Sequence, residues 1–260
     1  MQGIMPAPLA RSTGCWLQWL RADLPREQTR AYWRGPHARL VAQVPGLDEY
    51  RQHHFPPRDH GFWPAPPGVG TAIPADWRID GMPEVAFAGA LAPIRALGPR
   101  MWAVYHDESK FIDRILANLT GPGGGRWFRS GHEEEAGARA VVLLRRRRDV
   151  RFTAFRSFVH GVLAPALDLA AGTLELRSHV FLPYAKAVWW TPGVAHDNPP
   201  HRRYHAAIVL GAADRERLDV IVASPQVTAT QEAQAANCLA LHAYAVDDTY
   251  TIVRDGRRLL

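Results

Sequence analysis

Cysteine is scarce in this 260-residue sequence, which contains only Cys15 and Cys238. Two cysteines so far apart exclude a disulfide-stapled scaffold, and they form neither a paired-cysteine metal site nor a CxxC redox motif. Long hydrophobic runs are also missing, because no apolar stretch approaches the roughly 18 residues of a membrane-spanning helix. The first residues lack the charged and apolar regions of a secretory signal. We therefore expect a cytoplasmic protein with no membrane partner.

Lysine is almost absent as well, since Lys110 and Lys186 are the only lysines among 31 basic residues, which leaves 29 arginines. The formal net charge is +6, and the densest basic run joins Arg145–Arg148 to Arg151. Such a run can bind phosphates. It directly follows the apolar stretch Ala140–Leu144, so it also fits a strand that ends in solvent. No DNA- or RNA-binding motif accompanies the charge, and we expect no nucleic-acid partner.

An internal repeat divides the chain. Gly46–Phe55 (GLDEYRQHHF) and Gly172–Phe181 (GTLELRSHVF) place Gly, Glu, Arg, His and Phe at identical offsets. A helix-like segment precedes each copy, and a proline-rich loop follows it. We predict an N-terminal tail at residues 1–13, a first domain at 14–130 and a second, more diverged domain at 138–260. The glycine-rich and acidic stretch at 121–137 is expected to form the turn and linker.

Each half follows the βαββαβ order of a ferredoxin-like domain. The first half has expected strands at 13–22, 47–55, 84–87 and 111–119, and expected helices at 25–44 and 91–109. The second half has expected strands at 140–144, 173–182, 204–211 and 239–253, and expected helical regions at 152–170 and 214–236. Proline interrupts helical hydrogen bonding, so the first helix should kink or restart at Gly35–Pro36. The predicted fold class is α+β, with two tandem ferredoxin-like domains.

The second strand of each half has two chemically different faces, because side chains alternate with a period of two residues. One face is apolar and should pack on the helices. The other face carries Glu49, Arg51, His53 and Phe55 in the first copy and Glu175, Arg177, His179 and Phe181 in the second. If the sheets pack face to face as an α+β barrel, these side chains line its interior. They would form either a ligand pocket or a Glu–Arg ladder that ties the sheets together.

Four motifs in the first half carry a resemblance to a known family. In chain order they are Tyr32–Ala38 (YWRGPHA), Val44–Leu47 with Tyr50–Phe55, Asp80–Gly81 with Glu84–Phe87, and Asp107–Asp113 (DESKFID). This order and spacing resembles the EthD family of the dimeric α+β barrel superfamily. The second half keeps a histidine, His160, and the strand signature but has neither WRGPHA nor DExxFID, and its main role would be to close the barrel.

The resemblance implies ferredoxin-like units paired sheet to sheet, either within this chain or across a homodimer. The family and superfamily include proteins needed for bacterial ether degradation, lactone isomerases, polyketide decarboxylases and cofactor-free oxygenases. Most of their pockets take small aromatic or cyclic acids and use no metal. We accordingly expect no cofactor, and no HExxH motif or paired-cysteine spacing in the sequence indicates a metal site.

His37 is the first catalytic candidate, because imidazole transfers protons near neutral pH and the family motif places a histidine here. It also lies on the apolar face of its helix, where a histidine can be an ordinary buried residue. Tyr32 offers either a phenol as proton donor or a ring for packing. Asp107 and Glu108 stand at a helix–strand junction, where paired carboxylates can do acid–base work. We favour the alternative, that they cap the helix and form the turn.

For an acidic substrate, Arg51 is the expected carboxylate clamp and His53 the neighbouring proton-transfer group. Pairing of Arg51 with Glu49 is the structural alternative. Trp63 belongs to a proline-rich loop that either covers the barrel mouth or packs outside the helices. The complete expected substrate-binding set is Arg51, Glu49, Arg177, His179 and Trp63.

These observations favour a cofactor-independent enzyme that transfers protons on a small aromatic, lactone or polyketide-like acid, by isomerisation, decarboxylation or oxygenation. The alternative is a non-catalytic accessory or ligand-binding protein that supports a partner oxygenase in ether or xenobiotic degradation. A third hypothesis is haem binding, because some distant relatives with tandem ferredoxin-like domains hold haem through a histidine.

Overall fold

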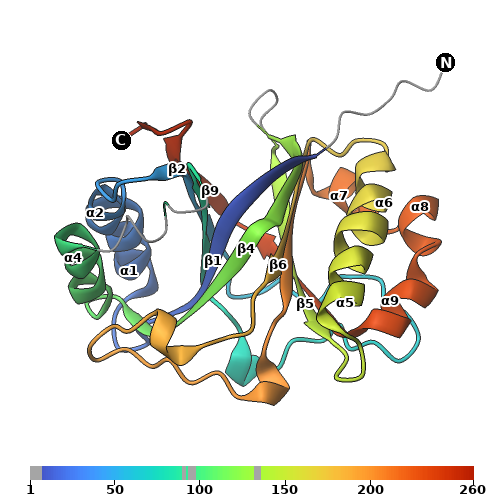
Figure 1. Cartoon of the computed structure of the whole chain (residues 1–260), viewed down its shortest axis with the longest axis horizontal. Helices are drawn as coiled ribbons and strands as arrows, with labels where there is room; N and C mark the ends of the chain where they lie inside the picture. The colour runs from blue at the N-terminus through green and yellow to red at the C-terminus, as the bar shows by residue number, and fades with distance from the viewer. Residues whose placement is uncertain (1–7, 90–91, 93–97, 132–135) are drawn as a thin grey trace.

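One antiparallel sheet of ten strands runs through the whole molecule, with helices on both of its outer sides (Figure 1). The structure is a computed structural model that describes residues 8–89, 92, 98–131 and 136–260. The strand order is β10-β9-β2-β3-β1-β4-β6-β7-β5-β8. The expected α+β fold is confirmed, and the sheet curls into an α+β barrel whose two halves face each other.

The expected βαββαβ order is present in each half. The first half contains β1 (Leu9–Leu20), α1 (Arg26–Tyr32), η1 (Trp33–His37), α2 (Ala38–Val41), β2 (Leu47–His54), η2 (Ala75–Trp77), β3 (Gly81–Phe87), α4 (Pro99–Glu108) and β4 (Ile112–Ser130). The second half contains β5 (Ala138–Arg146), α5 (Phe152–Phe158), η3 (Val159–Leu163), α6 (Ala164–Leu169), β6 (Glu175–Phe181), η4 (Lys186–Val188), η5 (Pro200–Arg202), β7 (Ala206–Ala212), α7 (Arg215–Val222), α8 (Pro225–Thr228), α9 (Gln231–Asn237) and β8 (Cys238–Val246). The chain ends with β9 (Asp248–Arg254) and β10 (Arg257–Arg258). Residues 90, 91 and 93–97 lie outside the described residues, and they include most of the beginning of the helix expected at 91–109.

The first helix passes Gly35–Pro36 without the expected restart. A π-helical turn at Trp33–His37 contains Pro36 and keeps the backbone helical into α2. Proline has no amide hydrogen to donate, and the wider turn accommodates it within the helix. The second half has a π-helical turn at the same place, Val159–Leu163. Each turn carries the histidine of its half.

The prediction of a linker at 121–137 is wrong for residues 121–130, because these residues continue β4. There β4 pairs with β1 on one side and with β6 on the other. The register shifts between Thr120 and Gly125, where Gly123 has a φ of +62°. The glycines therefore form a bulge inside a long strand, and that strand joins the sheets of the two halves.

The C-terminal strand expected at 239–253 is two strands, separated by Asp247 alone. β8 pairs with β5 of the second half, and β9 crosses to pair with β2 of the first half. Both ends of the strand order are thus joined through the chain. The barrel closes within one molecule and needs no second copy for this.

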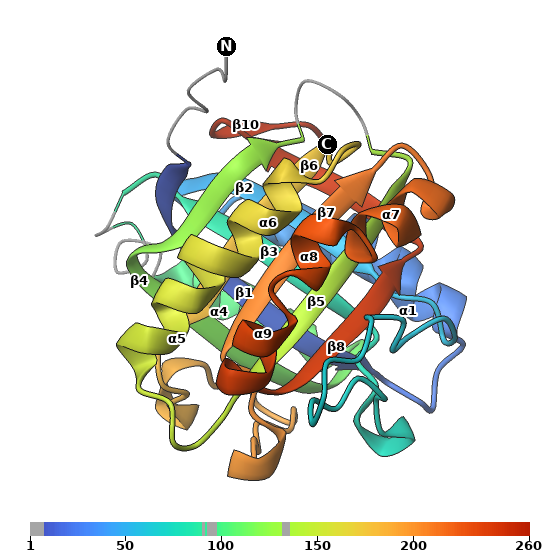
Figure 2. The ribbon, with the colours of Figure 1, turned by 90° about the vertical axis from the view of Figure 1, so that its right-hand side faces the viewer.

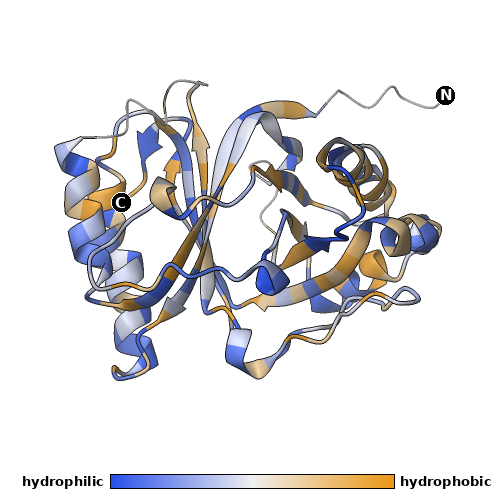
Figure 3. Ribbon diagram, turned by 60° about the horizontal axis from the view of Figure 1, so that its bottom comes forward, coloured by the Kyte–Doolittle hydropathy of each residue, from blue (hydrophilic) through white to orange (hydrophobic). Residues whose placement is uncertain are grey.

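Helices cover the outer faces of both halves, with α5, α6, α8 and α9 across the strands of the second half (Figure 2). Hydrophobic residues follow the strands in the middle, whereas the helices of the first half show much hydrophilic surface (Figure 3). As the alternation predicts, Leu176 and Val180 pack under the helices, and Phe181 joins an apolar cluster inside the barrel. Cys15 and Leu17 belong to the same inner cluster.

The rest of the barrel interior holds a buried ionic network. Arg51 pairs with Glu49 and lies 2.8 Å from Glu175, so it links β2 to β6 across the barrel. Arg177 lies 3.3, 3.2 and 3.0 Å from Glu49, Glu84 and Glu175. All five side chains are at most 3% exposed. Of the two interpretations left open by the sequence, the Glu–Arg ladder is the one that the interior contains.

Two histidines and a further arginine complete the network. His53 Nε2 and His179 Nε2 each lie 3.1 Å from the Glu84 carboxylate. Arg139 Nε lies 2.7 Å from Glu175 Oε2. Within the described residues, three carboxylates, from Glu49, Glu84 and Glu175, therefore meet three guanidinium groups, from Arg51, Arg139 and Arg177. The formal charges of these six groups cancel, which lowers the free-energy cost of burying them.

We expect Arg177→Met to lower the free energy of unfolding by about 3–5 kcal/mol, because it leaves buried carboxylates without their shared counter-charge. Urea denaturation measures the loss. Arg39→Met on α2 is the matched control, and its exposed position predicts a change within about 0.5 kcal/mol. If the two variants were equally stable, the network would not be what holds the barrel.

Candidate active site

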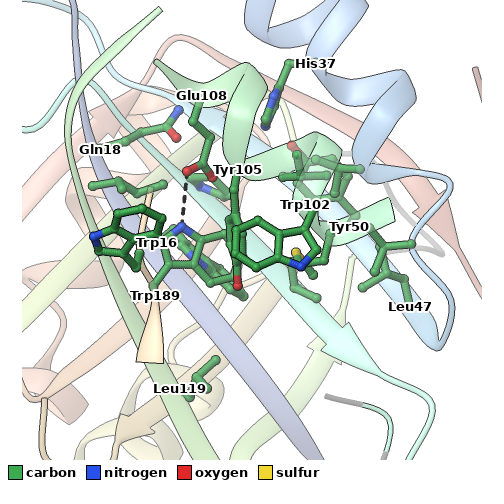
Figure 4. Close-up of a pocket in the computed structure, with 18 of the residues that line it drawn as sticks. Trp16, Gln18, His37, Leu47, Tyr50, Trp102, Tyr105, Glu108, Leu119 and Trp189 are labelled. Carbon is green, nitrogen blue, oxygen red and sulfur yellow. Dashed lines mark hydrogen bonds between the residues drawn. The ribbon is translucent and has the colours of Figure 1, made fainter. Parts of the chain in front are cut away.

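A cavity of about 500 Å³ lies between the outer face of the first-half sheet and helices α2 and α4 (Figure 4). Its walls are mainly hydrophobic and aromatic, and include Trp16, Leu47, Tyr50, Val85, Phe87, Trp102, Tyr105, Ile115, Trp189 and Trp190. The last two come from the loop after β6, so the second half covers the cavity of the first. A volume of this size suits a small cyclic or polycyclic molecule.

His37 lines this cavity and is oriented by Asp107. The Nδ1 atom of His37 lies 3.0 Å from Asp107 Oδ2. Asp107 also accepts hydrogen bonds from the Tyr32 hydroxyl at 2.6 Å and from Lys110 Nζ at 2.8 Å. Burial raises the pKa of Asp107, but the hydrogen bonds from His37, Lys110 and Tyr32 outweigh it and hold this pKa well below its ordinary value. The carboxylate is therefore ionised at neutral pH.

The state of Asp107 fixes the protonation of the histidine ring. An ionised carboxylate only accepts, so Nδ1 of His37 must donate. Burial lowers the pKa of His37, and Asp107 offsets this only in part, so the ring is neutral. Its Nε2 atom then carries a lone pair. The Tyr32–Asp107–His37 chain thus prepares a general base at the wall of the cavity.

Glu108 lines the same cavity in the opposite protonation state. Its side chain is buried, and its Oε2 atom accepts a hydrogen bond from Trp189 Nε1 at 3.2 Å (Figure 4). The same oxygen accepts a second hydrogen bond from the Thr191 hydroxyl. Burial raises the pKa of Glu108 to about 8, although these two hydrogen bonds lower it in part. Glu108 is consequently protonated at neutral pH and can act as a proton donor.

Two lining residues carry a buried side-chain donor. Within the described residues, the Gln18 Nε2 and Trp16 Nε1 atoms are buried and make no hydrogen bond. Both residues line the cavity. A buried donor without a partner is costly, but neither atom is exposed to the cavity. The mainly hydrophobic and aromatic walls therefore suit a mainly apolar ligand.

Aromatic rings determine the shape of the cavity. Trp189 makes edge contacts with Trp16 and Tyr105, at ring-centroid distances of 5.0 and 4.6 Å. Trp102 and Trp190 are 51% and 55% exposed, which places them where the cavity meets solvent. Flat walls of this kind favour a planar ligand.

The second half fills the corresponding space with side chains. Trp63, from the loop after β2, is buried in the hydrophobic core under α5–α9. Its Nε1 atom donates to Gln234 Oε1 at 3.0 Å, just as Trp189 donates to Glu108. Gln234 lies in α9 before β8, and Glu108 lies at the end of α4 before β4. The two halves thus exchange loops, and a neutral amide stands where the first half has its acid.

The structure separates the residues that the sequence grouped into one site. His37 lines the cavity, and Tyr32 acts on it through Asp107. The residues predicted around the barrel lie in the ionic network instead: Glu49, Arg51, His53, Arg177 and His179. Trp63 packs in the core of the second half. Only His37 and Tyr32 of the predicted set are therefore close to the cavity.

The sequence favours capping over acid–base work for Asp107 and Glu108, and it does not indicate that Trp189 contacts Glu108. Asp107 is 70 residues from His37, and Glu108 is 83 residues from Thr191. In the sequence, only the adjacent pair Trp189–Trp190, which lies in a long loop, indicates a segment that covers a pocket.

Solved structures of low sequence identity share the fold of this chain. A proposed monooxygenase from Lactobacillus acidophilus NCFM superposes with a TM-score of 0.56 at 10% identity, covering 94% of this chain and 97% of that one. One from Fusobacterium nucleatum gives a TM-score of 0.57 at 6% identity, covering 99% and 100%. An anthrone oxidase-like protein gives 0.54 at 9% identity, covering 94% and 96%. No protein-family model matches the chain, and no curated protein matches it.

No helix among the described residues has the length and apolar character needed to cross a membrane. No group of three or more His, Cys, Asp or Glu side chains in that part of the chain is arranged to hold a metal ion.

The raised pKa of Glu108 predicts a loss of stability with rising pH. The folded protein retains this proton up to about pH 8, whereas the unfolded chain loses it near the ordinary value of 4.5. Between these values the unfolded state binds fewer protons, so the free energy of unfolding falls by up to about 1.4 kcal/mol per pH unit. Glu108→Gln cannot titrate and should flatten this slope.

Urea denaturation of both proteins at several pH values between these limits measures the difference in slope. Glu27→Gln is the control, because the Glu27 side chain is 83% exposed and its substitution should leave the slope unchanged. Parallel pH profiles for the parent and Glu108→Gln would contradict a protonated Glu108.

Proposed function

We propose that the first-half cavity is the active site of an enzyme that removes a proton from a planar, largely apolar carbonyl compound or phenol. The observation that carries this proposal is the pair of opposed groups on one aromatic cavity. His37 is held neutral with a free Nε2 atom, and Glu108 is held protonated. Titratable neighbours whose pKa values are pushed apart are typical of acid–base sites.

The geometry supports a simple proton-transfer step. His37 Nε2 takes a proton from a carbon or oxygen of the substrate, and the ionised Asp107 stabilises the imidazolium that forms. Glu108 donates a hydrogen bond or its proton to the substrate oxygen, where negative charge develops. The resulting enolate or phenolate is either reprotonated at another carbon, which is isomerisation, or oxidised by dioxygen, which is oxygenation.

The charge of the cavity favours a neutral substrate over the acid expected from the sequence. No lysine or arginine is among the described residues that line it. Arg51, the expected carboxylate clamp, is neutralised by Glu49 and Glu175 inside the barrel. A carboxylate buried next to Glu108 would have no counter-charge. A neutral polycyclic ketone or phenol avoids that cost.

Oxygenation is the branch that the similar structures support, because two are proposed monooxygenases and one is anthrone oxidase-like. An aromatic enolate can reduce dioxygen directly, so the proposed step uses no metal or organic cofactor. Membership of the EthD family, a homodimer and a partner oxygenase stay predictions. A binding protein without chemistry is the competing function, and turnover distinguishes the two.

Anthrone is a suitable first probe, because it is planar, neutral and carries an acidic C–H opposite a carbonyl. Its oxidation by one dioxygen gives anthraquinone and water, which an oxygen electrode and absorbance follow together. We expect His37→Ala to lower kcat by at least about 100-fold, since it removes the general base. Asp107→Asn should also lower kcat, because it removes the group that fixes the ring.

His106→Ala is the matched control, because His106 lies on the same helix as Glu108 and is exposed. It should leave turnover unchanged. Full turnover by His37→Ala would refute the assigned base. Saturable binding of anthrone and related ketones by the parent protein, with no turnover of any of them, would favour the binding function.

A further inference from the structure

A second cavity, of about 330 Å³, lies in the second half, at the C-terminal end of β5. Its described lining includes Arg145–Arg148, Arg203 and His205, and contains no acidic residue. The apolar residues Pro200 and Leu239 complete one wall. This cavity shares no lining residue with the candidate active site.

The sheet topology gathers these residues. β5 runs antiparallel to both of its neighbours, so its C-terminal end meets the beginnings of β7 and β8. Leu144 is in register with Ala206, and Arg146 with Cys238. The arginine run at the end of β5 is therefore brought beside His205 and the loop that precedes β7.

The arginines are held in place without being neutralised. The side chain of Arg145 donates to the His201 carbonyl, that of Arg146 to the Val150 carbonyl, and that of Arg203 to the Asn198 carbonyl. A backbone carbonyl orients a guanidinium group but carries no compensating charge. Among the described residues, Arg147 is the one member of the run that pairs with a carboxylate, the exposed Asp149 at 3.2 Å, and such a pair contributes little.

The surroundings respond to this uncompensated charge. Burial and, after it, the charges of Arg146, Arg145 and Arg203 together lower the pKa of His205 to about 4. His205 Nδ1 accepts a hydrogen bond from the Arg146 backbone amide at 3.2 Å. The neutral ring must then carry its proton on Nε2, which makes it one more donor at the wall of the cavity.

We propose that this arginine cavity binds the phosphate or diphosphate group of a small molecule. Each oriented guanidinium group can bind two oxygens of a phosphate. If the run were only a strand end exposed to solvent, its guanidinium groups would not need to be held in fixed orientations. Pro200 and Leu239 offer an apolar wall to the rest of the ligand. The enclosed volume favours a small molecule over an extended nucleic-acid strand, which is recognised through long basic surfaces with aromatic stacking.

Isothermal titration of the full chain with inorganic pyrophosphate tests the proposal. We expect one saturable site, which weakens as salt rises. Arg147→Gln/Arg148→Gln should weaken binding at least about tenfold, because it removes charge-assisted hydrogen bonds. Arg257→Gln/Arg258→Gln on β10 is the matched control, because it removes the same charge from an exposed segment elsewhere and should bind as the parent does.

Thermal denaturation gives an independent readout, since pyrophosphate should raise Tm in the parent and the control but not in Arg147→Gln/Arg148→Gln. Titration with a nucleoside diphosphate shows whether an organic group adds affinity to that of pyrophosphate.

Absence of binding to the parent, or equal losses of affinity in both double variants, would overturn the proposal. Equal affinity for citrate would overturn the phosphate class. Tighter binding of a single-stranded oligonucleotide, lost with Arg147 and Arg148, would assign the cavity to nucleic acid instead.

Discussion

Pairing of buried charge inside the barrel is the constraint on which the rest of the structure depends. An unpaired carboxylate or guanidinium group there would cost several kcal/mol, so each must meet its partners across the interior. Arg51 reaches Glu175 on the opposite strand, and Arg177 reaches Glu49 and Glu84. If the pairing register of one of these strands shifted by one residue, its charged side chains would turn toward the helices and its apolar side chains would turn into the barrel. The network therefore fixes strand register and the way the two halves meet, and it leaves both outer faces apolar.

The two halves use their apolar outer faces differently. The second half fills its face with a solid core, whereas the first half leaves a cavity between the sheet and α4. The exchanged loops make the contrast chemical as well as steric. Trp63 donates to the amide of Gln234, and Trp189 donates to the carboxyl group of Glu108. Since Trp189 and Thr191 come from the second half, the candidate active site exists only when both halves are folded together.

Much of the fold could be predicted from the sequence, because it depends on local periodicity. Alternation along β2 and β6 correctly separated the helix-facing side from the barrel-facing side, and the βαββαβ order followed from element lengths. The predictions that failed concern pairing between segments that are distant in the sequence. Gly121–Ser130 contains the glycines of a linker, yet two neighbouring strands hold it extended. The break at Asp247 depends on β9 reaching β2, and no local pattern shows where a strand changes partners.

The candidate site was harder to predict, because its chemistry depends on depth and neighbours more than on residue type. The barrel strands carry Glu, Arg and His, the residues that a catalytic site also uses, but there they satisfy one another. Asp107 and Glu108 are adjacent in one helix, where consecutive side chains point about 100° apart. One therefore meets His37, Lys110 and Tyr32 and stays ionised, while the other meets Trp189 and Thr191 and keeps its proton. Two neighbouring carboxyl groups acquire opposite roles only through partners that the tertiary fold supplies.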